Sequence, residues 1–296
     1  MSVSTEHVVL VGVDGSPSSN AAVEWAARDA GLRGVPLVLV HVTPEPRVTL
    51  GVEIIRSAEV WRRLEDDARQ ILAQSRAIAE RISASAEPIR IDELAVSDGV
   101  VSGLVALSED ADMLVVGCRG LGSISGRLLG SVSSGLVHHA LCPVTIVHDE
   151  RRGSAEDMAR LPVVLGVDGS PASTSATAVA FDEASRRGVE LIALHAWADN
   201  VSIEFAGTDW DLLHERAAAA LAERLAGWRE RYPDVTVRRI VVPDRAARHL
   251  ITHSHDAQLV VVGSRGRGGF AGMLLGSVSS AVVEAAHSPV IVVRPS

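Results

Sequence analysis

Two glycine-spaced stretches of this 296-residue chain have residue types suited to binding an anion. The first, GCRGLGSISGRLLGSVSS, runs from Gly117 to Ser134, and the second, GSRGRGGFAGMLLGSVSS, runs from Gly263 to Ser280. Each has glycines at its first and fourth positions, then nine residues, then Gly-Ser. Glycine lets a ligand approach the backbone closely, and a helix that begins at the Gly-Ser pair offers free N–H groups to an anion. The spacing therefore predicts two phosphate-binding loops.

Positive charge and hydroxyl groups support this interpretation. Each copy carries two arginines in its loop and two serines at the start of the following segment, and both kinds of side chain bind phosphate oxygens. The alternative is that the glycines only form a turn. The recurrence of the whole pattern in a matched context favours phosphate binding. The residues concerned are Arg119, Arg127, Ser131 and Ser133 in the first copy, and Arg265, Arg267, Ser277 and Ser279 in the second.

The loops belong to a tandem duplication. GVDGSP at Gly12–Pro17 returns at Gly166–Pro171, and MLVVGCRG at Met113–Gly120 is matched by LVVVGSRG at Leu259–Gly266. A domain of about 145 residues is an ordinary size, so two copies account for the chain. We predict one domain over 1–149, a polar linker over 150–160 and a second domain over 161–296.

Within each copy, short apolar runs alternate with segments of helical periodicity. Runs of Val, Leu and Ile are typical of strands buried on both faces of a parallel sheet. The alternating stretches Pro88–Val96 and Val235–Val242 indicate strands nearer an edge, and Ser16-Pro17 predicts a helix start. The fold class is therefore α/β, with two Rossmann-like domains that each hold a doubly wound parallel sheet. Ligands of such sheets bind at the carboxyl ends of the strands, where both glycine loops begin.

With an Asp after the first strand, the Gly-x-x-Gly-x9-Gly-Ser pattern resembles the universal stress protein family in its tandem, ATP-binding form. The similarity covers residues 7–149 and 161–295. It implies a five-stranded sheet of order 3-2-1-4-5 in each domain, a pseudo-twofold relation between the domains, and one ATP per domain, with Mg²⁺ as an optional companion. That branch binds ATP without a P-loop lysine, which agrees with a chain whose 28 basic residues are all arginine.

The resemblance also implies roles for individual residues. One group lies at the adenine and ribose end, and the other holds the phosphates. Val42 of the first copy is replaced by Ala196 and Arg127 by Met273, so we expect the first site to bind more tightly. The adenine and ribose group is Gly12, Asp14 and Val42, repeated as Gly166, Asp168 and Ala196. The phosphate group is Gly117, Cys118, Arg119, Gly120, Arg127, Gly130, Ser131, Val132 and Ser133, repeated as Gly263, Ser264, Arg265, Gly266, Arg267, Gly276, Ser277, Val278 and Ser279.

Several of these residues, and a few others, have alternative interpretations. Asp14 and Asp168 can cap the helix that follows them or contribute to a metal site. Cys118 and Cys142 are either small packing residues or redox sensors, and serine stands at the matching positions of the second copy. His249, His253 and His255 fit an exposed helix face better than a zinc site. His41 and His195 end matching strands, where a buried hydrogen bond is a better explanation than catalysis.

Net charge and hydropathy exclude some classes of partner. A net charge of −9 argues against nucleic acid, and no apolar run is long enough to span a membrane. The first residues lack a signal-peptide pattern, so a cytoplasmic location is expected. We identify no catalytic residues and favour an ATP-binding stress regulator that acts on a protein partner. A slow ATPase or nucleotidyl-transfer enzyme and a nucleotide-free scaffold are the alternatives. The final strands Pro143–Asp149 and Pro289–Pro295 are expected to pair the two halves, and a homodimer is left open.

Overall fold

The computed structural model describes residues 7–43, 58–84, 88–120, 129–148, 155–197, 210–267 and 275–295. The chain divides into two compact units, Met1–Asp149 (unit 1) and Glu150–Ser296 (unit 2). The two sequence repeats therefore correspond to separate folded bodies, and each is described by itself.

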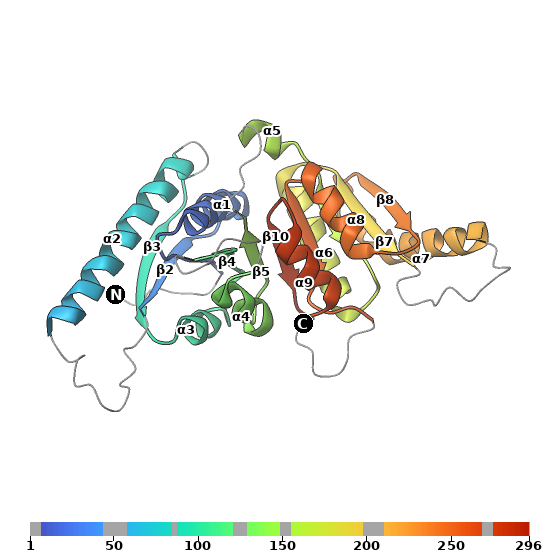
Figure 1. Cartoon of the computed structure of the whole chain (residues 1–296). Helices are drawn as coiled ribbons and strands as arrows, with labels where there is room; N and C mark the ends of the chain where they lie inside the picture. The colour runs from blue at the N-terminus through green and yellow to red at the C-terminus, as the bar shows by residue number, and fades with distance from the viewer. Residues whose placement is uncertain are drawn as a thin grey trace, which may run out of the picture. The chain divides into compact units, whose positions relative to one another are not determined.

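Unit 1 alternates strands and helices along the chain (Figure 1). Its strands are all parallel, and they pair in the order β3-β2-β1-β4-β5, which is the order that the resemblance implied. The elements are β1 (Val9–Gly12), α1 (Pro17–Arg33), β2 (Leu37–Thr43), α2 (Ala58–Ser83), β3 (Ile91–Ser97), α3 (Val100–Leu107), β4 (Met113–Gly117), α4 (Ser131–His139) and β5 (Val144–Val147).

Unit 2 repeats this plan, with its strands in the order β8-β7-β6-β9-β10. It begins with a short helix in the predicted linker. The elements are α5 (Ala155–Ala159), β6 (Val163–Gly166), α6 (Pro171–Arg187), β7 (Leu191–Ala196), α7 (Trp210–Arg231), β8 (Val237–Val242), α8 (Ala246–His253), the 3-10 turn η1 (Ser254–Asp256), β9 (Leu259–Gly263), α9 (Ser277–Ala285) and β10 (Val290–Val293).

Hydrophobic burial explains the strand assignments. The central strands β1 and β4 are buried almost throughout, as the continuous apolar runs predicted, whereas β3 alternates between half-buried and exposed positions. β3 and β8 lie at one end of their sheets, so the alternating stretches were correctly predicted to be edge strands. Polar side chains on β3 are tolerated because one of its sides faces solvent.

Two helical layers cover each sheet. The chain moves outward from β1 to β2 and β3, then returns to add β4 and β5 on the other side. Right-handed crossovers therefore place α1 and α2 on one face of the sheet and α3 and α4 on the other. In unit 1, α1 contacts α2, and α3 contacts α4. Figure 1 shows α2 running alongside β2 and β3, and α3 lying next to α4. Both faces of the central strands are thus removed from water, whereas β3 and β8 keep exposed positions.

The helix that follows the first strand begins and ends with the same local signals in both units. The Ser16 hydroxyl accepts a hydrogen bond from the Ser19 N–H, and Pro17 occupies the first helical turn. The helix ends at Gly34, whose φ of 67° is a left-handed conformation that glycine adopts without strain. Ser170 and Gly188 repeat these roles around α6. The predicted helix start at Ser16-Pro17 is confirmed.

Candidate functional site

The topology brings the predicted site residues to one edge of each sheet. β1 and β4 are parallel neighbours, and they end at Gly12 and Gly117, so the ends of the two strands lie side by side. β6 and β9 do the same in unit 2, where Gly166 and Gly263 end the two strands. The loop that carries the first Asp and the glycine loop therefore start together, at the place where a doubly wound sheet binds its ligands.

Close packing within the protein explains the first glycine of each loop. A Cβ on Gly117 would lie 2.6 Å from the main-chain carbon of Ser18, at the start of α1. A Cβ on Gly263 would lie 2.8 Å from the main-chain carbon of Ala172. A side chain at either position would force the backbone to move. Glycine is therefore needed at Gly117 so that the end of β4 can pack against α1, and at Gly263 so that the end of β9 can pack against α6.

Serine side chains tie the two loops of unit 1 together. The hydroxyl of Ser18 donates to the Arg119 carbonyl, and Asp14 accepts the Ser16 N–H at 2.9 Å. Gly120, the glycine at the fourth position of the loop, lies against this aspartate, because a Cβ there would be 2.6 Å from Asp14 Oδ2. The start of the glycine loop, as far as Gly120, is thereby held against the loop between β1 and α1.

Asp168 holds the same position in unit 2. Its Oδ1 accepts the Ser170 N–H at 2.9 Å and the Ser170 hydroxyl at 2.7 Å. Its Oδ2 accepts the main-chain N–H of Arg267 at 3.0 Å. These contacts favour the structural interpretation of this aspartate, which joins the start of α6 to the glycine loop.

The helices after the two glycine loops begin without a side-chain cap. Gly130 occupies the N-cap of α4 and Gly276 the N-cap of α9, and neither has a side chain to accept the first N–H groups. The first serine of each helix, Ser131 or Ser277, is exposed beside these groups. Each helix therefore presents unsatisfied donors and the positive end of its dipole at the site.

The second serines have a different position from the first. Ser133 is buried, and its hydroxyl donates to the Gly117 carbonyl at 2.7 Å. Ser279 is buried in the same way and donates to the Gly263 carbonyl at 2.6 Å. In the described structure these hydroxyls anchor the helix to the end of the strand.

The predicted base end lies at the end of the second strand of each unit. Val42 is buried near α3, with Cγ1 3.5 Å from the position of a Cβ on Gly103, and Ala196 is half-buried. His41 Nδ1 donates to the Val13 carbonyl at 2.8 Å, and His195 Nδ1 donates to the Val167 carbonyl at 2.7 Å. The predicted hydrogen-bonding role of both histidines is confirmed. Burial lowers the pKa of His195 below its usual value.

The loop arginines differ in what the structure describes of them. Arg127 lies outside the described residues. Arg265 is half-buried, and its Nε is buried without a hydrogen-bond partner among the described residues. Arg267 is exposed. A buried guanidinium N–H without an acceptor is costly, and a bound anion would satisfy it.

One cationic side chain at this edge was not predicted. Arg224, on α7, lies 2.8 Å through its Cζ from the position of a Cβ on Gly169, in the loop between β6 and α6. Its pKa is lowered by burial and by the nearby Arg267. No motif in the sequence signals this position, because Arg224 lies on a crossover helix far from the glycine loop along the chain.

The cysteines and the remaining histidines lie in the protein as follows. Cys118 and Cys142 are both buried and form no disulfide, as expected of small packing residues. Burial raises the pKa of the Cys142 thiol to about 12. His249 and His253 are on α8, and the ring of His255 lies 3.8 Å, centre to centre, from that of His287. Among the described residues, no group of three or more His, Cys, Asp or Glu is arranged to hold a metal ion. Within the described ranges, none of the helices has the length and apolarity to cross a bilayer.

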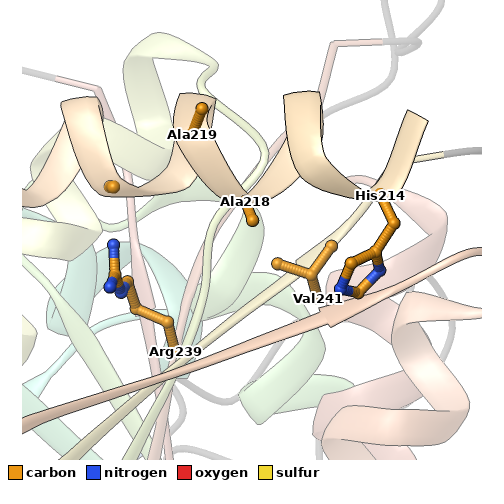
Figure 2. Close-up of a pocket in the computed structure, with 6 residues that line it drawn as sticks. His214, Ala218, Ala219, Arg239 and Val241 are labelled. Atoms are coloured by element: carbon orange, nitrogen blue, oxygen red, sulfur yellow. The ribbon is translucent and has the colours of Figure 1, made fainter. Parts of the chain in front are cut away.

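A separate pocket of about 390 Å³ opens between α7 and β8 (Figure 2). Figure 2 shows the Arg239 guanidinium reaching toward α7 and the His214 ring directed toward β8, beside Val241. Its other lining residues are alanines of α7. None of the residues that line it was predicted to bind nucleotide.

Comparison with known proteins agrees with this geometry. The model of the Universal stress protein family matches residues 6–148 and 160–294. A universal stress protein of Mycobacterium tuberculosis is 51% identical over 288 residues, which cover 97% of this chain and 96% of the relative. Another, from Mycobacterium bovis, is 49% identical over 292 residues and 98% of each chain. The crystal structure of a universal stress protein from Archaeoglobus fulgidus has the same fold, with a TM-score of 0.70, 22% identity and coverage of 98% of this chain and 97% of that one.

Proposed function

The chain belongs to the universal stress protein family, and from this premise we propose that each unit binds one molecule of ATP and that occupancy regulates the protein. The phosphates would lie at the start of α4 in unit 1 and of α9 in unit 2. The base and ribose would lie toward Val42 and Ala196. The proposal gives no catalytic role to any residue.

The contrast between two helix starts in each unit carries the proposal. α1 and α6 begin with a serine whose hydroxyl accepts an N–H of its own helix. α4 and α9 begin with a glycine and have no side-chain cap, and they start at the carboxyl ends of the strands, where sheets of this kind bind their ligands. Helix starts whose donors have no protein cap are suited to an external anion, and ATP supplies three phosphate groups.

The neighbouring groups fit a polyphosphate. The exposed hydroxyls of Ser131 and Ser277 lie at the helix starts, and the buried Nε of Arg265 needs an acceptor. The described start of each loop is held by a hydrogen bond, from Ser18 to the Arg119 carbonyl in unit 1 and from the Arg267 N–H to Asp168 in unit 2. Mg²⁺ would enter, if at all, on the phosphate oxygens.

The output would be a shift between conformations or partners. A ligand shifts such an equilibrium only as far as its affinity differs between the states. We propose a protein partner that distinguishes the ATP-bound form from the empty form. Pairing of the two halves, and assembly into a homodimer, belong to the same proposal.

The purified protein tests this directly. It is denatured, and the released small molecules are identified by chromatography and mass spectrometry, and a second sample is titrated with ATP with and without Mg²⁺. Two ATP per chain supports the proposal. Mostly ADP, with turnover of added ATP, would favour the enzymatic alternative. No released nucleotide, together with no binding of added ATP, would contradict the proposal and favour a scaffold.

A further inference from the structure

Two guanidinium groups meet over one glycine of unit 2. The terminal nitrogen Nη2 of Arg267 and the Cζ and Nε of Arg224 all lie within 2.8 Å of the position that a Cβ on Gly169 would take. Gly169 has a φ of 78°, in the loop that leads into α6. One arginine comes from the glycine loop and the other from α7, so residues far apart in the sequence form this pair, which we call the arginine pair.

Unit 1 has an apolar residue at the matching place. The equivalent glycine is Gly15, and the atom nearest to the position of a Cβ on it is Cγ1 of Ile71, at 3.4 Å. In the sequence, the glycine at the fourth position of the loop is followed by Leu121 in the first copy and by Arg267 in the second. Two of the differences between the copies therefore concern this place, where unit 1 has the apolar residues Ile71 and Leu121 and unit 2 has the cations Arg224 and Arg267.

Among the described residues, Asp168 and Glu223 only partly offset the charge of the arginine pair. Two like charges repel at short range, and the pKa of Arg224 is lowered by burial and by Arg267, an effect that Asp168 only partly offsets. Both oxygens of Asp168 already accept other donors, namely the N–H and hydroxyl of Ser170 and the main-chain N–H of Arg267. Nη1 of Arg224 is buried without a hydrogen-bond partner among the described residues. A polyanion between the two guanidinium groups would relieve the repulsion and satisfy this donor.

We infer that Arg224 and Arg267 bind the terminal phosphates of a nucleoside triphosphate in unit 2, so that this site selects nucleotides by the number of their phosphates and the unit 1 site does so much less. The inference rests on the proposed function, since it assumes that a nucleotide occupies the site. It adds a specificity determinant from α7, outside the glycine loop. It also changes the expected ranking of the two sites, which rested on Val42 and Arg127 alone.

The experiment measures each site separately in the full-length protein. Gly130→Asp blocks the unit 1 site and Gly276→Asp blocks the unit 2 site, because each places a carboxylate at the helix start. Isothermal titration calorimetry then gives the Kd of ATP and of AMP for the open site. In the Gly130→Asp background, Arg224→Ile introduces the residue that unit 1 has. Arg224→Lys keeps the charge without the planar fork, and Arg229→Ile is the control, because Arg229 is exposed elsewhere on α7.

The preference for ATP over AMP is the quantity that decides. A charge-assisted hydrogen bond contributes enough to change an equilibrium about 10- to 100-fold. Arg224→Ile should therefore reduce the ATP-to-AMP preference of the unit 2 site about 10- to 100-fold, with Arg224→Lys in between and Arg229→Ile unchanged. The unit 1 site, measured in the Gly276→Asp background, should show a preference at least about tenfold weaker than the unit 2 site.

The failures are distinguishable. If Arg224→Ile weakens ATP and AMP equally, or leaves the preference unchanged while nucleotide still binds, the arginine pair does not bind the terminal phosphates. Equal preferences at the two sites would also overturn the inference, and the proposed function would stand. If the unchanged protein binds neither nucleotide, the proposed function itself is wrong, and the inference is lost with it. Circular dichroism and thermal unfolding of each variant confirm that a loss of binding is not a loss of fold.

Discussion

Replacing Gly276 by aspartate should abolish nucleotide binding in unit 2 without harming the fold. Gly276 is the N-cap of α9 and has an extended backbone, with φ −77° and ψ 155°, which any residue can adopt. The nearest atoms to a Cβ there, including Arg265 Cα and Gly266 N, are 3.5 Å away, an ordinary van der Waals distance. Aspartate is among the preferred N-cap residues, and its carboxylate would accept an N–H of the first turn.

The magnitudes follow from this position. As a helix cap, aspartate should change stability by only a few tenths of a kcal/mol relative to glycine, in the favourable direction. For binding, a carboxylate about 4 Å from a phosphate charge, at an effective dielectric constant of about 20, costs about 4 kcal/mol. That energy corresponds to a loss of affinity of about 10³-fold. The substitution should therefore separate binding from stability clearly.

The assay combines native mass spectrometry, which counts ATP molecules per chain, with thermal unfolding. Gly276→Asp should bind one ATP per chain and unfold at the same temperature as the unchanged protein or slightly higher. Gly276→Asn has the same shape without the charge, so it separates electrostatic repulsion from filling of the space. Two ATP per chain with unchanged affinity in Gly276→Asp would refute the assignment of the phosphates to the start of α9.

Three further predictions concern stability and reactivity. Gly117→Ala should destabilise unit 1 by about 2–3 kcal/mol in urea unfolding, because its Cβ would lie 2.6 Å from the Ser18 backbone. Gly227→Ala is the control: a Cβ there meets no neighbouring atom within 4 Å, so this change in α7 should stabilise unit 2 by about 0.5–1 kcal/mol. Equal effects of the two substitutions would contradict the packing argument. Burial, with the nearby Arg224 and Arg267, lowers the pKa of His195, so below about pH 6.5 the unfolded chain binds a proton that the folded unit does not, and the free energy of unfolding should fall with acidification. His195→Gln should flatten this dependence between about pH 7.5 and 5.5, and an unchanged slope would show that another group is responsible. The Cys142 thiol, buried and with a pKa of about 12, should react with a thiol reagent at about pH 8 only after denaturation; rapid reaction in the folded protein would disprove its inert packing role.

Sequence reasoning predicted the features that depend on local pattern. Apolar runs, helix periodicity and the Ser-Pro helix start predicted the strands and α1, and the repeated motif predicted two units with the site at the same edge of each sheet. The alternation in β3 and β8 identified them as strands near an edge, because the central strands of a parallel sheet are covered by helices on both faces and leave no room for polar side chains. These inferences succeed because neighbouring residues determine each of them.

The sequence alone left the purpose of several site residues open. Gly117 was predicted to let a ligand approach, but the structure adds that α1 itself needs the space. Asp168 was predicted to lie at the base end or to cap a helix. The structure adds that it accepts a hydrogen bond from the Arg267 N–H, which is possible only because the fold brings two loops that are distant in the sequence together. Ser133 was expected to face phosphate, and its hydroxyl bonds the end of β4 instead.

What the sequence determined, then, was the duplicated α/β framework, since it follows from periodicity and from short motifs. The same motifs predict the place of the two proposed anion sites. Tertiary structure alone brought Arg224 of α7 to Arg267 and left Ile71 opposite Gly15. The physical reason is that a side chain on a crossover helix reaches the site through the packing of that helix on the sheet. The strength of an electrostatic contact depends on the distance in space between the two charges, and the number of residues between them in the sequence does not determine that distance.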